Sequence, residues 1–173
     1  MGAEGFTAYQ NGTEAEQAFQ EAVENAEHEH GHGGYTGTLA EKNSYTVITK
    51  TPMPMDEAEE YATKLLNADD PRISDKWGPA GAIPVLTDRR EVEVIITTAD
   101  APAGGFRSRE AAATAVLTAR GELEEGEKPV YGITGVYETH PRTGRLCAGT
   151  LRVPLEGGPL QHRGWLFFGY ASC

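Results

Sequence analysis

The chain has 173 residues, with 26 Asp and Glu against 15 Lys and Arg, so its formal net charge is −11. That length suits one domain or two small ones, and 39% apolar residues are enough to close a core, which argues against intrinsic disorder. The negative charge disfavours direct nucleic-acid binding, and we find neither a long apolar run nor the pattern of a signal peptide. We therefore expect a cytoplasmic protein without a membrane span, in which two cysteines are too few for a disulfide scaffold.

Amphipathic periodicity predicts three helices. In the first, Thr13 and Glu16 have the spacing of a capping box, and an apolar stripe follows with the helical period. Asp56 and Glu59 form a similar pair before the second, and Gly126 is a suitable stop for the third. The predicted ranges are 13–30, 56–67 and 108–125. The outer face of the first helix is strongly acidic and would suit a basic protein surface.

Strands are predicted from β-branched and aromatic content between turn signals. Their ranges are 6–9, 35–40, 45–50, 82–86, 91–99, 130–138, 145–153 and 164–171. Short polar links at 41–44 and 142–144 predict hairpins, and hence antiparallel pairing.

Together these elements predict an α+β fold, in which an antiparallel sheet carries helices on one face. The order β-α-β-β occurs over 6–50 and again over 91–153, so we consider two pseudo-repeats. The corresponding division is an N-terminal α+β half at 1–87 and a C-terminal α+β half at 88–173. The alternative is one continuous domain.

Three histidines, His28, His30 and His32, alternate with carboxylates and glycines near the end of the first helix. Imidazoles suit zinc, nickel or copper, so these residues are weak candidates for a metal site. Residues two apart on a helix point in different directions, however, which favours histidines that cap the helix or lie on the surface. We predict no cofactor, with a bound divalent metal as the alternative.

Two loops have compositions that could serve binding. Residues 33–38 are rich in glycine and hydroxyl side chains, and these could hold a small anion near Lys42, although the strand–loop–helix order of a phosphate loop is missing. Residues 69–81 combine both signs of charge, two prolines and Trp77. This second loop either packs Trp77 into the core or contacts a ligand or partner, and the burial of Trp77 decides between the two.

The last ten residues are almost entirely apolar, from Gly164 to Cys173. Such a segment is typical of a core strand, and an exposed one would indicate an oligomer interface. We favour the core strand and keep a homodimer as the alternative.

The stretches 31–42 (GHGGYTGTLAEK) and 70–81 (DPRISDKWGPAG) resemble small uncharacterised proteins encoded by bacteriophages, particularly those of actinobacteria, and by their prophages. The resemblance covers about residues 6–86, and the second half is similar to an extension of some longer members. It implies a viral accessory protein that acts in the host cytoplasm. It implies no catalytic residues.

We therefore expect an accessory binding protein that sequesters or inhibits a host or defence component, either a protein or a small signalling nucleotide. The alternative is a nucleotide-directed or metal-assisted hydrolase or transferase with a site around His32 and the loop 72–77. The residues expected to line the pocket are His32, Tyr35, Thr38, Lys42, Arg72, Lys76 and Trp77. For a nucleotide, the three cations would meet phosphate and an aromatic ring would stack on the base.

Overall fold

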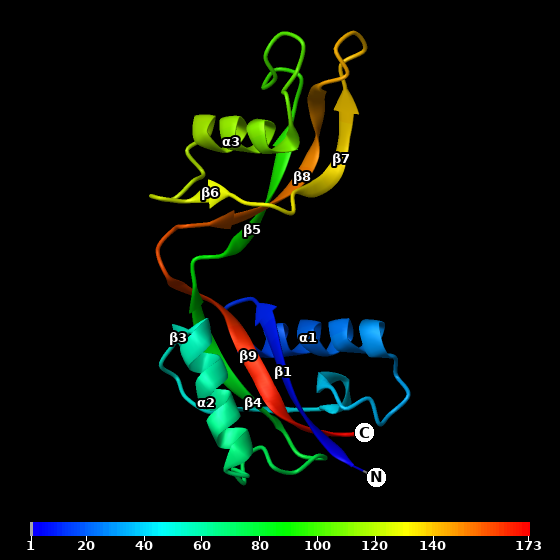
Figure 1. The fold of residues 1–173 in the computed structure, drawn as a ribbon, viewed down its shortest axis with the longest axis vertical. Coiled ribbons are helices and arrows are strands. Elements are labelled where there is room, and N and C mark those ends of the chain that lie inside the picture. The colour runs from blue at the N-terminus through cyan, green and yellow to red at the C-terminus, as the bar shows by residue number, and fades with distance from the viewer. Residues whose placement is uncertain (1) are drawn as a thin grey trace. The chain divides into compact units, whose positions relative to one another are not determined.

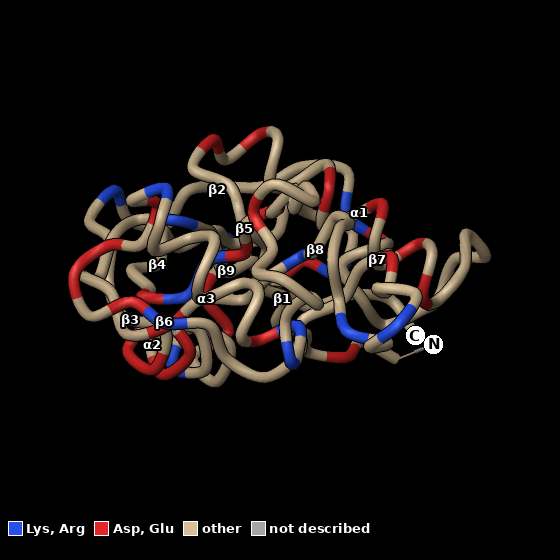
Figure 2. Tube along the Cα trace, turned by 90° about the horizontal axis from the view of Figure 1, so that it is seen from above, with Lys and Arg blue, Asp and Glu red and all other residues tan. Residues whose placement is uncertain are grey.

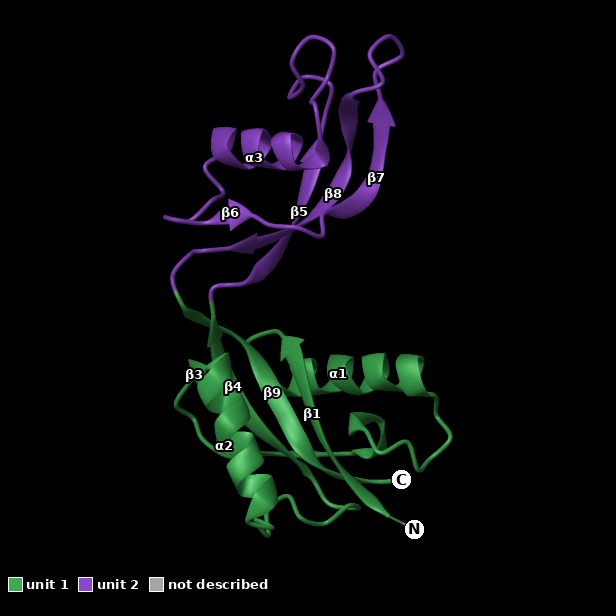
Figure 3. Cartoon of the chain, in the orientation of Figure 1, with its two compact units in different colours: residues 1–87, 160–173 green, residues 88–159 purple. Residues whose placement is uncertain are grey.

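The computed structural model describes residues 2–173 and divides them into two compact units (Figure 3). Unit 1 contains residues up to 87 together with 160–173, and unit 2 contains residues 88–159. The chain thus leaves unit 1 after Thr87 and returns to it at Leu160. The sequence division into 1–87 and 88–173 does not include this return of the last residues. Each unit combines a helix or helices with a sheet, which confirms the α+β class.

Unit 1 is built on a mixed sheet in the order β1-β9-β4-β2, with the short β3 also on β4 (Figure 1). Its strands are β1 (Ala3–Asn11), β2 (Tyr45–Val47), β3 (Met53–Pro54), β4 (Ala80–Thr87) and β9 (Gln161–Ser172). β9 pairs antiparallel with both β1 and β4, whereas β2 and β3 run parallel to β4. The apolar C-terminal segment is therefore a central core strand, as predicted.

Helices cover both faces of the sheet in unit 1, which corrects the expectation of one covered face. Alternate residues of β9 point to opposite faces. Trp165 and Phe167 pack in one core with α1 (Ala15–His30), while Leu166 and Phe168 pack in another with α2 (Met55–Asn67). Gly81 of β4 leaves room for the Phe168 ring, because a Cβ at Gly81 would lie 2.6 Å from it.

Unit 2 has its own sheet and its own core. β5 (Arg90–Ile96) and β8 (Leu146–Glu156) pair antiparallel, and β6 (Lys128–Pro129) and β7 (Thr134–Thr139) both pair with the other edge of β8. Helix α3 (Arg109–Ala119) packs on this sheet through a core of alanine, valine and leucine side chains. The link at 142–144 does join two antiparallel strands, as predicted.

Several predicted elements are wrong. Residues 35–40 form no strand: they form a loop followed by the short 3-10 helix η1 (Leu39–Glu41). The hairpin at 41–44 and the proposed repeat therefore do not form. The strand expected over 130–138 is interrupted and becomes β6 and β7.

The helix ends also differ from the predictions. Glu14 and not Thr13 precedes α1, Pro54 precedes α2, and neither provides a side-chain cap. Helix α3 ends at Ala119 because Gly121 adopts a positive φ of 65°. No helix among residues 2–173 has the length and apolar character needed to cross a bilayer.

Candidate functional site

The loops at 31–42 and 69–79 meet in unit 1 around the side chain of Lys42. Lys42 is buried, with 2% of its surface exposed, and its Nζ donates to the carbonyl oxygens of Asp75, Lys76 and Gly78 at 3.0–3.2 Å. Burial lowers the pKa of Lys42, and the nearby charge of Asp75 opposes that shift. The lysine therefore joins the two loops, and its three donors do not face a ligand.

Tyr35 and Trp77 lie together on the surface of these joined loops. Their ring centroids are 6.2 Å apart in an edge-to-face arrangement, and 53% of Tyr35 and 59% of Trp77 are exposed. The Nζ of Lys76 lies 5.5 Å from the centre of the Trp77 ring and donates to the carbonyl of Gly2. We call Tyr35, Lys76 and Trp77 the aromatic surface. The exposure of Trp77 overturns the interpretation of a loop that packs this side chain into the core.

The backbone holds Tyr35 in an uncommon conformation. Its φ is +62°, a region that side chains other than Asn and Asp rarely adopt. Two residues further on, the N–H of Gly37 donates to the carbonyl of Ser172 at 2.8 Å, which ties the loop to the end of β9. Local backbone strain held by surrounding structure is typical of functional positions.

Thr38 supports the same loop through its own hydrogen bonds. Its Oγ1 accepts from the N–H of Ala40 at the start of η1 and lies 2.9 Å from Oγ1 of Thr36. Thr36 in turn donates its N–H and its hydroxyl to Glu41. Thr38 thus stabilises the turn that follows the aromatic surface.

The remaining predicted residues lie in separate contacts. Arg72 binds Asp70 through two guanidinium nitrogens at 2.9 Å, and this lowers the pKa of Asp70 to about 2. His32 is exposed, with its Nδ1 3.4 Å from a carboxylate oxygen of Glu27. The structure therefore brings four of the seven predicted residues together, namely Tyr35, Lys42, Lys76 and Trp77.

The histidine cluster forms separate pairs. His30 lies 3.8 Å from Glu29, and His32 lies beside Glu27. Among residues 2–173, no three His, Cys, Asp or Glu side chains come together as candidate metal ligands.

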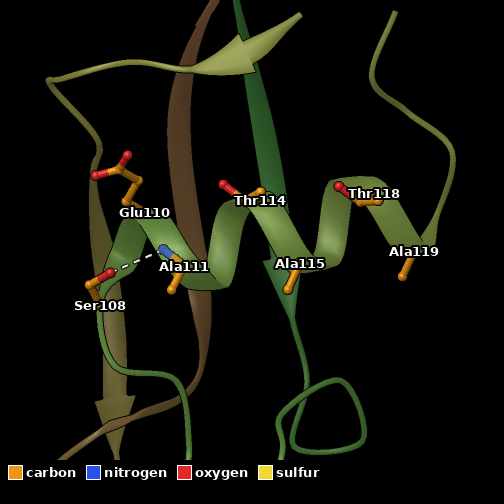
Figure 4. A pocket seen from close by; sticks show the side chains of 7 residues that line it. All are labelled: Ser108, Glu110, Ala111, Thr114, Ala115, Thr118 and Ala119. Carbon is orange, nitrogen blue, oxygen red and sulfur yellow. Dashed lines mark hydrogen bonds between the residues drawn. The ribbon is translucent and has the colours of Figure 1, made fainter.

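Two surface hollows lie on the outer sides of helices. One of about 650 Å³ is lined only by residues of α3 and its N-cap Ser108, mostly alanine and threonine (Figure 4). A similar hollow of about 750 Å³ lies along α2 and contains acidic side chains such as Glu59 and Glu60. A single helix supplies no opposing wall, so neither hollow has the concave, convergent shape of a ligand pocket.

No family model matches the chain, and no curated protein or solved structure matches it either.

Proposed function

We propose that this chain is an accessory binding protein that captures a partner protein through the aromatic surface. The observation that carries the proposal is the exposed Tyr35–Trp77 pair on two loops that the buried Lys42 joins. Exposed aromatic side chains on a fixed backbone give large contact area at little entropic cost, and Trp and Tyr are enriched among the residues that dominate protein interfaces.

The environments of the three predicted cations favour a protein partner over a signalling nucleotide. Phosphate recognition needs cations with available donors. Lys42 uses its ammonium on three carbonyls, Arg72 is neutralised by Asp70, and Lys76 contacts Gly2 and the Trp77 ring. The resemblance of 31–42 and 70–81 to phage proteins points to a host or defence component as the partner.

The proposal is tested by affinity capture from an actinobacterial lysate. We compare the wild-type chain with Trp77→Ala and with Tyr131→Ala, which removes a fully exposed aromatic side chain in unit 2. The expected result is one protein retained by wild type and Tyr131→Ala and lost from Trp77→Ala, with unchanged melting temperatures. A partner retained equally by all three, or a small molecule retained in native mass spectrometry without any protein, contradicts the proposal.

A further inference from the structure

A second surface of unit 1 lies along the outer edge of β1, beside α1. A cavity of about 350 Å³ there is lined by residues of β1, the facing side of α1, and the start of η1. The lining residues are Phe6, Thr7, Ala8, Tyr9, Gln10, Ala22, Asn25, Ala26, Glu29, His30, Thr38 and Leu39. We call this cavity the β1 groove.

The groove exposes backbone hydrogen-bonding groups. In the described part of the chain β1 pairs with β9 alone, so its other edge is free. Gly2 and Cys173 exchange backbone hydrogen bonds, and the N–H of Gly12 donates to the carbonyl of Arg163. With the observed register, it follows that the even-numbered residues of β1 form the hydrogen-bonded pairs with β9. The N–H and C=O groups of Thr7 and Tyr9 therefore point outward into the groove.

The two ends of the groove differ. At one end, side chains bridge from β1 to α1: Gln10 donates to Glu21, and Asn25 donates to Gln10. At the other end Glu29 and Thr38 line the cavity, and Glu4, just outside the lining, lies beside Gly37, where a Cβ would be 3.4 Å from that of Glu4. Side chains bridge the first end, whereas the second carries the carboxylates of Glu4 and Glu29, with His30 3.8 Å from Glu29.

The walls of the groove admit small apolar side chains. Ala8 lies on the β1 side and Ala22 and Ala26 on the α1 side, so this part of the lining consists of small apolar side chains. No lysine or arginine is among the lining residues of the described chain, and acidic positions run along α1 (Figure 2). An occupant with a positive charge near Glu4 and Glu29 would complement this surface.

We propose that the β1 groove binds an extended segment of a partner protein, which adds to β1 as an antiparallel strand and places a basic side chain between Glu4 and Glu29. Strand addition to a free sheet edge takes its affinity from main-chain hydrogen bonds and its specificity from alternate side chains. Apolar side chains of the segment would lie under Ala22 and Ala26. The inference goes beyond the proposed function because it concerns a different surface. Its test measures the amides of β1 and does not depend on Trp77.

The test is an NMR titration of the full-length, 15N-labelled chain with the peptide acetyl-Thr-Val-Thr-Val-Thr-Lys-amide. Antiparallel addition places both valines and the lysine on the side of α1, with the lysine at the acidic end. The expected result is that the amides of Thr7 and Tyr9 shift and become protected from hydrogen exchange. The same peptide with Glu in place of Lys should bind less tightly.

Variants identify which part of the groove binds the peptide. Thr7→Pro removes an outward N–H without removing a bond to β9, and it should abolish the shifts, whereas Thr7→Val should keep them. Glu29→Gln should weaken binding about two- to fivefold, as expected for one exposed ion pair, and Glu24→Gln, outside the groove, should not. The Glu29 variant keeps the test valid if Thr7→Pro fails to fold.

Three outcomes overturn the inference: no shift at β1, equal binding of the Lys and Glu peptides, or shifts at the edges of the sheet in unit 2 instead. Protection of Thr7 and Tyr9 that rises with protein concentration in the absence of peptide would also overturn it, because a second copy would then be the occupant.

Discussion

The side chain of Lys42 is buried, and its ammonium donates to three backbone carbonyls. Lys42→Met keeps the approximate length of the side chain but leaves those carbonyls without a donor, so we expect it to lower the free energy of unfolding by about 2–3 kcal/mol. Urea denaturation measures the loss. Lys64→Met on the exposed side of α2 is the matched control and should change stability little. Equal stability of both variants would contradict the role assigned to Lys42.

Arg72 and Asp70 form an exposed pair with a defined dependence on pH. Hydrogen bonds from Arg72 lower the pKa of Asp70 from its usual 3.8 to about 2. The pair thus stabilises the folded state above pH 3.8, and this contribution is lost as the pH falls through the folded-state value. We expect Arg72→Ala to raise the Asp70 pKa from about 2 part of the way toward 3.8, because the guanidinium is lost while the backbone N–H of residue 72 still donates to the carboxylate. Carboxyl 13C titration measures this shift. A value that stays near 2 in the variant would show that another group holds the carboxylate.

Two candidate helix caps, Ser108 and Thr13, can be compared directly. Ser108 accepts a hydrogen bond from the N–H of Ala111 at the start of α3, whereas Thr13 contributes its carbonyl, and not its side chain, to Trp165. Ser108→Ala should therefore cost about 1 kcal/mol of stability, and Thr13→Ala less than about 0.5 kcal/mol. Thermal unfolding of both variants tests this. A larger loss of stability from Thr13→Ala than from Ser108→Ala would contradict this assignment and support the capping box that the sequence suggests.

Some elements are predicted well from the sequence, and others are not. The three helices lie where apolar periodicity places them, because that pattern is local. The strand expected over 35–40 fails although its composition is suitable. Positive φ at Tyr35 and Gly37 is incompatible with an extended strand. The hydrogen bond from Gly37 to Ser172, and those from Lys42 to the carbonyls of the 69–79 loop, hold this conformation. Those contacts join distant residues, so a local pattern does not reveal them.

In the candidate site, too, some features are predictable from local sequence and others depend on distant contacts. Tyr35 and Trp77 were expected at a common pocket from the composition of their loops, and the structure brings them together. The role of Lys42 differs from the expected anion contact, since a lysine's burial depends on what packs over it. The β1 groove has no sequence signal of its own, because it depends on the pairing of the first strand with the last.

At the scale of the whole molecule, the two units have separate cores, and we expect them to unfold separately. Phe167 is fully buried between α1 and the sheet of unit 1, and Leu151 is fully buried in unit 2. Phe167→Ala should remove about 3–5 kcal/mol and Leu151→Ala about 2–5 kcal/mol, each from its own unit. Native-state hydrogen exchange resolves this, because each substitution should lower the protection of amides in one unit and leave the other unchanged. Loss of protection across both units from either substitution would show that they unfold as one cooperative domain.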